Sequence, residues 1–521
     1  MSEVFKSEQK RLRLLLEQDY EVPDYQREYS WKHYQVKSFI DDATHVNKSR
    51  IKNYFFGPMV FIPHTDKHTV IDGQQRLATV STFIAVVRDI ISEKKLSYNY
   101  YQKLLYSNTK SKYRLTLNEI NSEFFQTNIL EKIKPPKEKI HEMKSIDGLR
   151  ESDKLILDMY EYFYKRLKSI AKENNGNSQL KKLVKNTLDF FKVISIEAAY
   201  ENAHLIFETL NERGIPLTKS DLVKNYLIMR GGQDKSKKIH EKWKELTNNT
   251  RNKTDDFLKY FCVAHYGETP KDQIYRKIKE KNFTKDDVLK LIEALVKSSK
   301  IFAELVEPSS TYWREKEIVT SIKSLNILDS IVFYPLLMLL KEKNIQNRDI
   351  RDILKICISL FVRYKTILHK HATKLEKLTI KACEEIRNGS PPKSTIRKLF
   401  KSILPNNPEF ISAFELHAQK NNAIAKYLLF EIYKNDQRDA VPAETITLEH
   451  VVPESVEKQS DLAPSEKDQD VTIWETYVQK NGITLSDIYR LGNMALLLPG
   501  DNTEASNKSF NDKKRFIRSH H

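Results

Sequence analysis

The C-terminal part of the chain carries the pattern that most constrains its fold. Polar and apolar residues alternate over residues 445–452, as on a strand, and Pro453 indicates that the extended run stops nearby. Residues 494–498 read as a second, apolar strand, and a turn at Pro499-Gly500 leads into a closing helix. We therefore predict a small ββα unit near the C-terminus, with the rest of the chain folded around other cores.

The length and composition predict several domains that are mostly helical. A chain of 521 residues is too long for one core, so about two to four domains are expected. Apolar residues make up 40% of it and only 12 residues are glycine, which favours folded, largely helical domains. The predicted fold class is α+β, predominantly helical. We expect an N-terminal α/β domain with a helical insertion (1–230), a helical linker domain (231–435) and a C-terminal ββα-metal domain (436–521).

The charge balance points to an anionic partner. The formal net charge is +17 and the isoelectric point is near 9.3, which favours nucleic acid or an anionic membrane. The alternative is a lysine-rich proteome, because much of the excess is lysine spread along helices. Charge alone leaves both interpretations open.

The cysteines and the apolar runs concern location. Cys262, Cys357 and Cys383 are an odd number at wide spacing, which excludes a disulfide framework and a CxxC-type zinc site and suits a reducing compartment. We see no signal peptide and no run of about 18 apolar residues, so a cytoplasmic location and no membrane span are expected.

Residues 1–92 look like a compact α/β unit. Helices are predicted at 11–18 and 32–46, with strands at 54–62 and 68–71. A helix follows from Gln74, because apolar residues recur there at intervals of three and four. A strand at 193–196 is expected to return to this unit. Residues 235–435 are predicted to be a helical array, because apolar residues recur there at the helical interval, as at Ile353, Ile356, Leu360, Tyr364 and Ile367.

The run Asp72-Gly73-Gln74-Gln75-Arg76 lies on the predicted strand–turn–helix junction. Gly73 permits a tight turn, amides at the helix start attract anions, and Arg76 can pair with a phosphate. Asp72 could hold Mg²⁺ or a water molecule, and Gln74 or Gln75 could orient a nucleophile or read a base. In the alternative interpretation Asp72 is a helix N-cap that forms a capping-box-like pair with Gln75.

Glu449 and His450 end the first strand of the ββα unit and offer the chemistry of phosphodiester cleavage. That reaction needs an activated water molecule, and a histidine supplies general-base catalysis while a metal neutralises charge. Adjacent strand residues face opposite sides, so both can serve one site only if the strand ends there. Asn502 is expected at the start of the closing helix, within reach of the metal, and Asn493 is expected to brace the loop. The alternative is a surface histidine with asparagines at turns and caps.

Residues 445–516 resemble the HNH nuclease domain of the GmrSD-type, modification-dependent (type IV) restriction proteins. The resemblance rests on Glu449-His450-Val451-Val452-Pro453, Gly492-Asn493, Asn502 and Ser506-Asn507-Lys508-Ser509-Phe510 with a later lysine. The first block also resembles Asp-His-Ile-Val-Pro in the HNH domains of CRISPR effectors. The resemblance to the GmrSD-type nuclease domain implies that His450 is the general base and that Glu449 and Asn502 bind Mg²⁺ (or Mn²⁺). Asn493, Asn507 and Lys513 join the catalytic set, the last two without assigned roles. Glu449 replaces the commoner aspartate.

The N-terminal part is similar to the ParB-like domain of the same family. The resemblance is carried by Tyr25-Gln26-Arg27-x-Tyr29-x-Trp31, by the Asp72–Arg76 run and by a block at 207–225. In that family the Asp-Gly-Gln-Gln-Arg motif is associated with nucleoside triphosphate (NTP) hydrolysis. Six residues are candidates for a sensor or pocket: Tyr25, Gln26, Arg27, Asn211, Arg213 and Lys224. Helix capping and surface charge are the alternative for the last three, and burial in the core is favoured for the aromatic residues.

Together these resemblances imply a Mg²⁺-dependent DNA endonuclease of a phage-defence restriction system that resembles fused GmrSD and SspE-type proteins. Double-stranded, phage or modified DNA and an NTP are the implied partners, and a homodimer is possible. The alternatives are a nucleotide-regulated DNA-binding protein without nuclease activity and an NTPase whose product signals. No motif assigns a role to residues 231–435.

Overall fold

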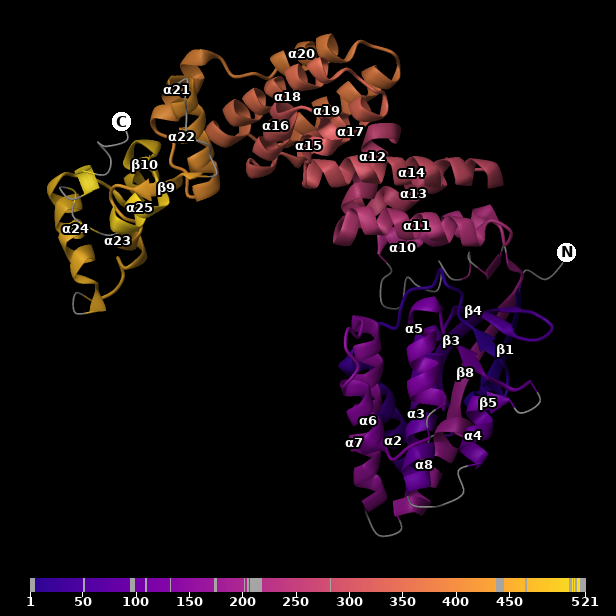
Figure 1. Ribbon diagram of the computed structural model, residues 1–521. Helices are drawn as coiled ribbons and strands as arrows, with labels where there is room; N and C mark the ends of the chain where they lie inside the picture. The colour runs from indigo at the N-terminus through magenta and orange to yellow at the C-terminus, as the bar shows by residue number, and fades with distance from the viewer. Residues whose placement is uncertain are drawn as a thin grey trace. The chain divides into compact units, whose positions relative to one another are not determined.

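The computed structural model divides into two compact units, residues 1–245 with 278–294 (unit 1) and residues 246–277 with 295–521 (unit 2). Figure 1 labels their helices and strands. The residues it describes are 5–49, 52–93, 99–107, 110–131, 133–172, 176–200, 202, 203, 206, 218–281, 283–436, 445–463, 466–505, 508, 510 and 513–515. The predicted division into three domains stays a prediction.

Unit 1 is built on a six-stranded mixed sheet. In sheet order the strands are β1 (Phe5–Arg11), β8 (Phe191–Ala198), β3 (Tyr54–Pro63), β4 (His68–Asp72), β2 (Tyr20–Glu21) and β7 (Leu115–Thr116). β8 runs parallel to β3 and antiparallel to β1, so a strand more than a hundred residues downstream of β4 completes the sheet. The predicted return strand at 193–196 is confirmed. β1 was not predicted.

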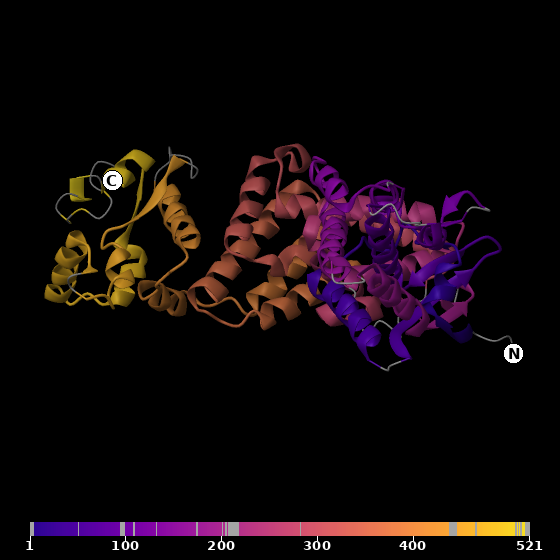
Figure 2. The same ribbon diagram turned by 90° about the horizontal axis from the view of Figure 1, so that it is seen from below.

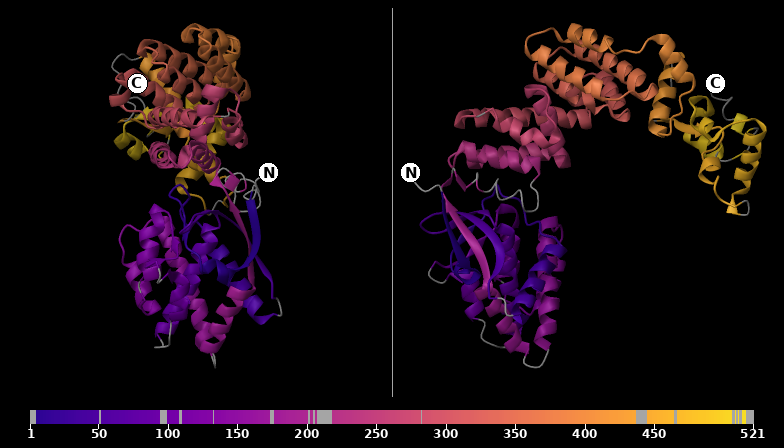
Figure 3. Two further views of the ribbon diagram at one scale, coloured as in Figure 1. Left: turned by 90° about the vertical axis from the view of Figure 1, so that its right-hand side faces the viewer. Right: turned by 180° about the vertical axis from the view of Figure 1, so that it is seen from behind.

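Four long helices cover the sheet of unit 1: α2 (His33–Lys48), α3 (Gln74–Glu93), α7 (Glu151–Lys172) and α8 (Gly176–Phe190). Figure 3 shows them gathered on one side of the sheet. Phe39 contacts the rings of Phe83, Phe163 and Phe191, which come from three other elements, so the aromatic residues join helices and sheet in one core. α3 lies at the centre of this core and begins at the Asp72–Arg76 run.

Shorter elements complete unit 1. They are α1 (Leu12–Leu16), α4 (Asn99–Leu105), β5 (Tyr106–Ser107), β6 (Lys112–Tyr113), α5 (Glu119–Phe124), the π-helix η1 (Phe125–Glu131), α6 (Pro136–Lys144) and α10 (Lys219–Gly231). α11 (Ser236–Thr250), α13 (Ile274–Lys279) and α14 (Lys285–Val306) span the boundary between the two units.

The first part of unit 2 is a helical array, as predicted for residues 235–435. Its helices are η2 (Arg251–Lys253), α12 (Thr254–Tyr266), η3 (Lys271–Gln273), α15 (Ser310–Trp313), α16 (Lys316–Ile327), η4 (Ile331–Phe333), α17 (Tyr334–Glu342), α18 (Asn347–Phe361), the π-helix η5 (Val362–Ile367), α19 (Thr373–Arg387), α20 (Pro392–Lys401), α21 (Asn407–Glu415) and α22 (Asn422–Asp436). Ile353, Leu360, Tyr364 and Ile367 are buried along the α18–η5 face, so the helical spacing read from the sequence marks a core face.

The C-terminal part of unit 2 contains the predicted ββα unit. Its elements are β9 (Thr447–His450), α23 (Ser455–Lys458), α24 (Gln469–Lys480), η8 (Leu485–Tyr489), η9 (Leu491–Asn493), β10 (Met494–Leu497) and α25 (Pro499–Ala505). β9 and β10 pair antiparallel, and Figure 2 shows both strands beside α22. Pro499 and Gly500 were predicted as a turn. They are instead the first residues of α25, where a proline without an N–H fits well.

The α+β, predominantly helical fold class is confirmed. Within the described residues no helix combines the length and the apolar character that crossing a bilayer requires.

Candidate functional site

Glu449 and His450 are the last two residues of β9. β9 stops at His450, which pairs with Met494 of β10, so the alternation of side chains need not continue past it. His450 is buried and Glu449 is half-buried. The predicted stop near Pro453 is therefore confirmed. Both residues still lie within β9 and pair with β10, so the alternation places their side chains on opposite faces of the strand.

Asn493 holds the loop that follows β9. Its Oδ1 accepts a hydrogen bond from Val452 N at 2.9 Å, and its Nδ2 donates to Val452 O at 3.1 Å and to Ile488 O at 2.8 Å. Its own carbonyl accepts from Val451 N at 2.8 Å. Both polar atoms of its side chain bond to the backbone, so Asn493 braces the turn.

Asn502 lies on α25, which packs against β9. One of the two polar atoms of its side chain has a hydrogen-bond partner among the described residues. Its Nδ2 is 3.4 Å from Leu448 O, a long hydrogen bond. Its Oδ1 is buried and has no hydrogen-bond partner among the described residues. A buried amide oxygen without a partner costs free energy, so this atom is well suited to an external ligand such as a cation.

Lys513 makes contacts that could not be predicted from the sequence. Its side chain is fully buried, and its Nζ lies 2.5 Å from Glu449 Oε1 and 2.8 Å from His450 O. The ammonium also lies 5.7 Å from the centre of the Trp474 ring. Burial lowers the pKa of Lys513 while Glu449 opposes that shift, and burial raises the pKa of Glu449 while Lys513 opposes it.

Glu454 faces the ring of His450. His450 Nε2 is buried and makes no hydrogen bond among the described residues, but Glu454 Oε1 lies 3.6 Å away. Burial lowers the pKa of His450, and the Glu454 carboxylate partly restores it. A neutral imidazole at pH 7 can accept a proton, which is what a general base requires. Sequence reasoning missed Glu454, although its spacing of four from His450 was a usable signal.

Glu449 and Asn502 provide the oxygen atoms that a hard cation would use. No group of three or more His, Cys, Asp or Glu residues in the described parts of the chain is placed to hold a metal ion. A divalent ion here would therefore take one carboxylate and one amide oxygen from the chain and complete its coordination with water and phosphate, as Mg²⁺ commonly does. The orphaned Oδ1 of Asn502 fits that description.

The Asp72–Arg76 run of unit 1 is a tightly built junction. Arg76 Nη2 is 2.8 Å from Asp72 Oδ2, and both side chains are about one-fifth exposed. Gly57 (φ 114°) packs against this arginine, because a Cβ there would lie 2.5 Å from Arg76 Nη1. Gly73 (φ 109°) is equally close to Met59. Two glycines thus fix the position of the Asp72–Arg76 ion pair.

The two glutamines of the run bind backbone. Gln74 Nε2 donates to Arg27 O at 3.1 Å. Gln75 Oε1 accepts from Ser30 N at 2.9 Å, and its Nε2 donates to Glu28 O at 3.1 Å. Both side chains therefore hold the loop at residues 25–31 to the start of α3. Both polar atoms of the Gln75 amide are used by the loop, whereas Gln74 uses only its Nε2.

The capping-box interpretation of this junction is wrong. The first intrahelical bond runs from Leu77 N to Gly73 O at 2.9 Å, which makes Gly73 the N-cap. Asp72 pairs with Arg76, and Gln75 bonds to the loop at 25–31. The spacing of Asp72 and Gln75 suggested a capping box, but Gln75 bonds to the loop at 25–31 in place of the helix start.

The loop at 25–31 is mostly buried. Tyr25 and Tyr29 are buried, which agrees with the core placement favoured from sequence, and Gln26 Nε2 donates to Ile71 O at 3.0 Å. Two residues that sequence reasoning missed hold the other side of the loop. Asn118 Nδ2 donates to the carbonyls of Gln26 and Arg27, and Asn121 Oδ1 accepts from Tyr29 N. Arg27, Tyr29 and both glutamines border a cavity of only about 10 Å³, too small for a nucleotide.

Lys224 lies on α10 close to the same loop. Burial lowers the pKa of Lys224 to about 8, and the carboxylates of Asp221 and Glu28 oppose the shift. Three sequence candidates, Asn211, Arg213 and Asn507, lie outside the described residues.

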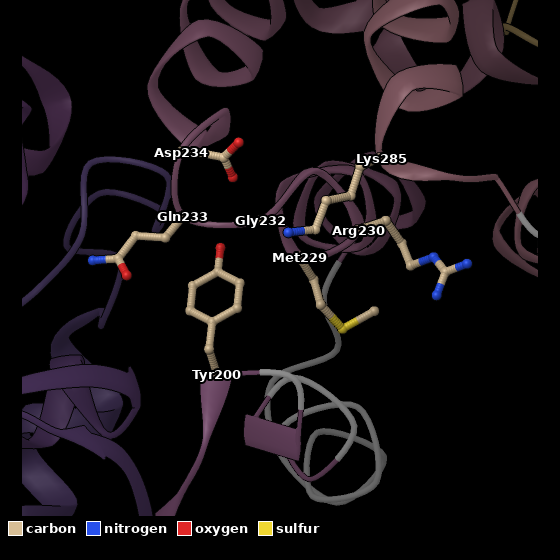
Figure 4. A pocket seen from close by; sticks show the side chains of 7 residues that line it. All are labelled: Tyr200, Met229, Arg230, Gly232, Gln233, Asp234 and Lys285. Atoms are coloured by element: carbon tan, nitrogen blue, oxygen red, sulfur yellow. The ribbon is translucent and has the colours of Figure 1, made fainter.

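A larger pocket lies at the end of α10. It has a volume of about 750 Å³, and Figure 4 shows side chains that line it, among them Tyr200, Arg230, Asp234 and Lys285. Lys285 Nζ approaches Gly232 closely, and this lysine forms no ion pair with a described residue. Arg230 is anchored by two bonds to Phe283 O, at 3.1 and 2.8 Å. The pocket has the volume of a small-molecule site and carries two cations.

Two protein-family models match the chain. Residues 1–228 match the GmrSD restriction endonuclease N-terminal domain, and residues 404–521 match the GmrSD restriction endonuclease C-terminal domain. The chain belongs to the GmrSD family of restriction endonucleases. A nuclease of a restriction system acts on DNA, so DNA is a partner of this chain.

The GmrSD matches also divide the structure in an informative way. The C-terminal match includes Glu449, His450, Asn502 and Lys513. The N-terminal match includes Tyr200 of the 750 Å³ pocket and ends before its other lining residues. Residues 229–403, most of the helical array, lie outside both models. No curated protein matches this GmrSD chain.

Proposed function

We propose that the ββα unit is an HNH-type DNA endonuclease site that works with Mg²⁺ or Mn²⁺. The observation that carries this proposal is the buried Oδ1 of Asn502, which has no hydrogen-bond partner among the described residues and lies on α25, the helix packed against the strand that ends in Glu449 and His450. When bound, the metal would neutralise charge on the phosphate and the leaving oxygen. Glu449 and Asn502 would hold it.

His450 supplies the proton acceptor in this proposal. Burial favours its neutral form at pH 7, and its Nε2 has no hydrogen bond to break before it accepts a proton from water. Glu454, 3.6 Å away, stabilises the imidazolium that forms. Asn493 keeps the loop rigid so that His450 stays aligned with the scissile phosphate.

Unit 1 is proposed to bind and hydrolyse an NTP and thereby to control cutting. Two features support this: the Arg76 guanidinium held partly exposed at the start of α3, and the 750 Å³ pocket with Lys285 and Arg230. The small cavity beside Gln74 and Gln75 makes the larger pocket the better place for the nucleoside. If NTP turnover persists at the wild-type rate in an Asp72→Ala, Arg76→Ala double variant, the hydrolytic role of the run is wrong.

The experiment that tests the proposed function is a plasmid digestion with the full chain. Methylated, glucosylated, phosphorothioated and plain DNA are incubated with Mg²⁺ or with EDTA, each with and without NTPs. We expect nicking or cutting of at least one DNA with Mg²⁺, abolished by EDTA and changed by NTP. Equal, negligible cutting in every arm would leave a DNA-binding protein without nuclease activity. Steep loss of DNA affinity with rising salt is expected in either case, from counterion release.

A further inference from the structure

The helical array of unit 2 contains a second pocket, in the region that neither family model covers. It has a volume of about 470 Å³ and is bordered by α12, η4, α17, η5 and α19. Val263, Pro335 and Phe361 are buried in its wall, and the half-buried ring of Tyr260 lies beside them. An apolar and aromatic wall in a cavity of this size is typical of a small-molecule or base-binding site.

Thr379 gives this pocket an unused polar atom. The residue is 1% exposed, it lines the pocket, and its Oγ1 has no hydrogen-bond partner among the described residues. A helical threonine can bond to the carbonyl four residues earlier, as Thr320 does to Lys316 O at 3.0 Å. Because a buried hydroxyl without a partner is costly, the Thr379 hydroxyl is suited to a ligand that donates or accepts a hydrogen bond.

The backbone around the pocket is irregular in two places. Lys365, on its border, belongs to the π-helix η5, and π-helical turns are found frequently at functional sites. Asp329, also on the border, adopts a left-handed conformation with φ 55°. Such conformations are uncommon outside glycine and cluster at ligand sites.

Carboxylates at the border of the pocket indicate the kind of ligand. The carboxylates of Glu268, Asp329 and Glu376 are exposed at the border of the pocket. Burial raises the pKa of the Tyr260 hydroxyl to about 12, and the charges of Asp329 and Glu376 add to the shift, which places both acids near the phenol. Lys259 and Lys365 also border the pocket, so its charge is mixed. The carboxylates can accept hydrogen bonds from the amino group of a base, which favours a base that carries such a group.

The surface next to the pocket carries positive charge. α19, which contributes Glu376 and Thr379 to the pocket, also carries the exposed Lys374 and Lys377. Neither lysine forms an ion pair with a described residue. A DNA backbone could therefore lie along α19 while one unstacked base enters the pocket.

We propose that this pocket receives an unstacked nucleobase that carries an exocyclic amino group, of the cytosine or adenine type. Its ring stacks on Tyr260 beside Phe361, its amino group donates to Asp329 or Glu376, and Thr379 Oγ1 bonds to a ring acceptor. The proposal rests on the proposed action on DNA, and it makes the helical array the part of the chain that inspects a base.

The test measures binding of uncharged nucleosides to the full chain by saturation-transfer NMR and titration calorimetry. Deoxycytidine and deoxyadenosine are expected to bind more tightly than thymidine, which has no exocyclic amino group. Thr379→Val, which keeps the shape of the side chain, should weaken deoxycytidine binding roughly fivefold, as the loss of one hydrogen bond does. Thr320→Val, on α16 away from the pocket, should leave binding unchanged.

Three results would overturn the proposal: no nucleoside binding, equal binding by Thr379→Val and the wild type, or binding of thymidine as tight as that of deoxycytidine. Failure of the nuclease proposal is distinguished by measuring plasmid cleavage on the same preparations. Nucleoside binding that depends on Thr379 in a protein that cuts no DNA would contradict the nuclease and leave a base-binding pocket. Cleavage without nucleoside binding would contradict only the pocket.

Discussion

Lys513 Nζ lies 2.5 Å from Glu449 Oε1, so a buried ammonium is bonded to the carboxylate that we expect to bind the metal. Mg²⁺ binds carboxylate oxygens at about 2.0–2.1 Å, so both cations on Glu449 would lie within a few ångströms of each other. At that separation in a half-buried site their repulsion is strong. Lys513 and the metal therefore weaken each other's binding to Glu449.

Replacing Lys513 with Met should consequently raise the affinity for Mn²⁺ by about tenfold or more. Met has a comparable length and suits the apolar surroundings near Trp474, so the fold should persist. Mn²⁺ binding is read by electron paramagnetic resonance, with Lys513→Arg as the charged control. Equal or weaker Mn²⁺ binding by the Met variant would mean that Lys513 helps to build the metal site.

The same contact predicts a change in the exposure of Lys513. Metal binding should release the ammonium from Glu449, so an amine-reactive reagent read by mass spectrometry should modify Lys513 with Mn²⁺ and spare it without. Lys139, buried against Asp89 in unit 1, should be protected in both states, and the exposed Lys290 should react in both. Protection of Lys513 in both states would show that it stays on Glu449.

Two asparagines should respond differently to truncation. Asn502→Ala removes the unpartnered Oδ1 and should lower Mn²⁺ affinity with little effect on Tm. Asn493→Ala removes three hydrogen bonds to the backbone and should destabilise unit 2 by about 1–3 kcal/mol. Calorimetry and metal titration on both variants separate the effects. The opposite pattern would exchange their roles.

Gly57 offers a test of the Asp72–Arg76 junction. Gly57→Ala adds a Cβ that would lie 2.5 Å from Arg76 Nη1, whereas Gly148→Ala, also at positive φ in unit 1, meets nothing within 4 Å. Both changes carry backbone strain of about 1 kcal/mol. Urea unfolding should show a larger loss of stability for Gly57→Ala, together with lower NTP turnover. Equal losses and equal turnover would mean that the position of Arg76 does not matter.

The lowered pKa of Lys224 predicts that the stability of the fold changes above pH 8. Its pKa falls from 10.5 in the unfolded chain to about 8 in the folded one, so between these values the unfolded state binds more protons. The free energy of unfolding should therefore rise with pH across this window, by up to about 1.4 kcal/mol per pH unit. Below pH 8 both states hold the proton and the effect vanishes. Lys224→Met should lack this rise in urea unfolding at pH 7, 8.5 and 10, whereas parallel curves would refute the shift.

Local patterns predicted much of this fold. The helical spacing after Gln74 and through the α18–η5 segment marked real core faces, and the alternation before Pro453 located β9 to within two residues. Long-range pairing was less accessible. β1 is polar and exposed, so its sequence has no alternation of apolar residues that would predict a strand. Its partner β8 also lies far along the chain.

The elements that carry the candidate site were predictable, and the contacts of its residues were less so. Glu449 and His450 end β9 and Asn502 lies on the helix packed against it, whereas the pairing of Lys513 with Glu449 joins residues distant in sequence. Asn118 and Asn121, which hold the loop at 25–31, give no sequence signal because asparagine is common in turns. Asp72 looked like a helix cap, since only the tertiary contacts of Gln75 reveal that it is not.

The central claim is that the ββα unit cuts DNA with His450 as the general base. The most direct measurement is Mg²⁺-dependent cleavage of a susceptible plasmid by the wild type and by His450→Ala, with His417→Ala as a buried-histidine control in unit 2. We predict that His450→Ala loses cleavage by at least about a hundredfold while still binding Mn²⁺ and DNA, and that His417→Ala cuts normally. Equal cleavage by the wild type and His450→Ala would contradict the account.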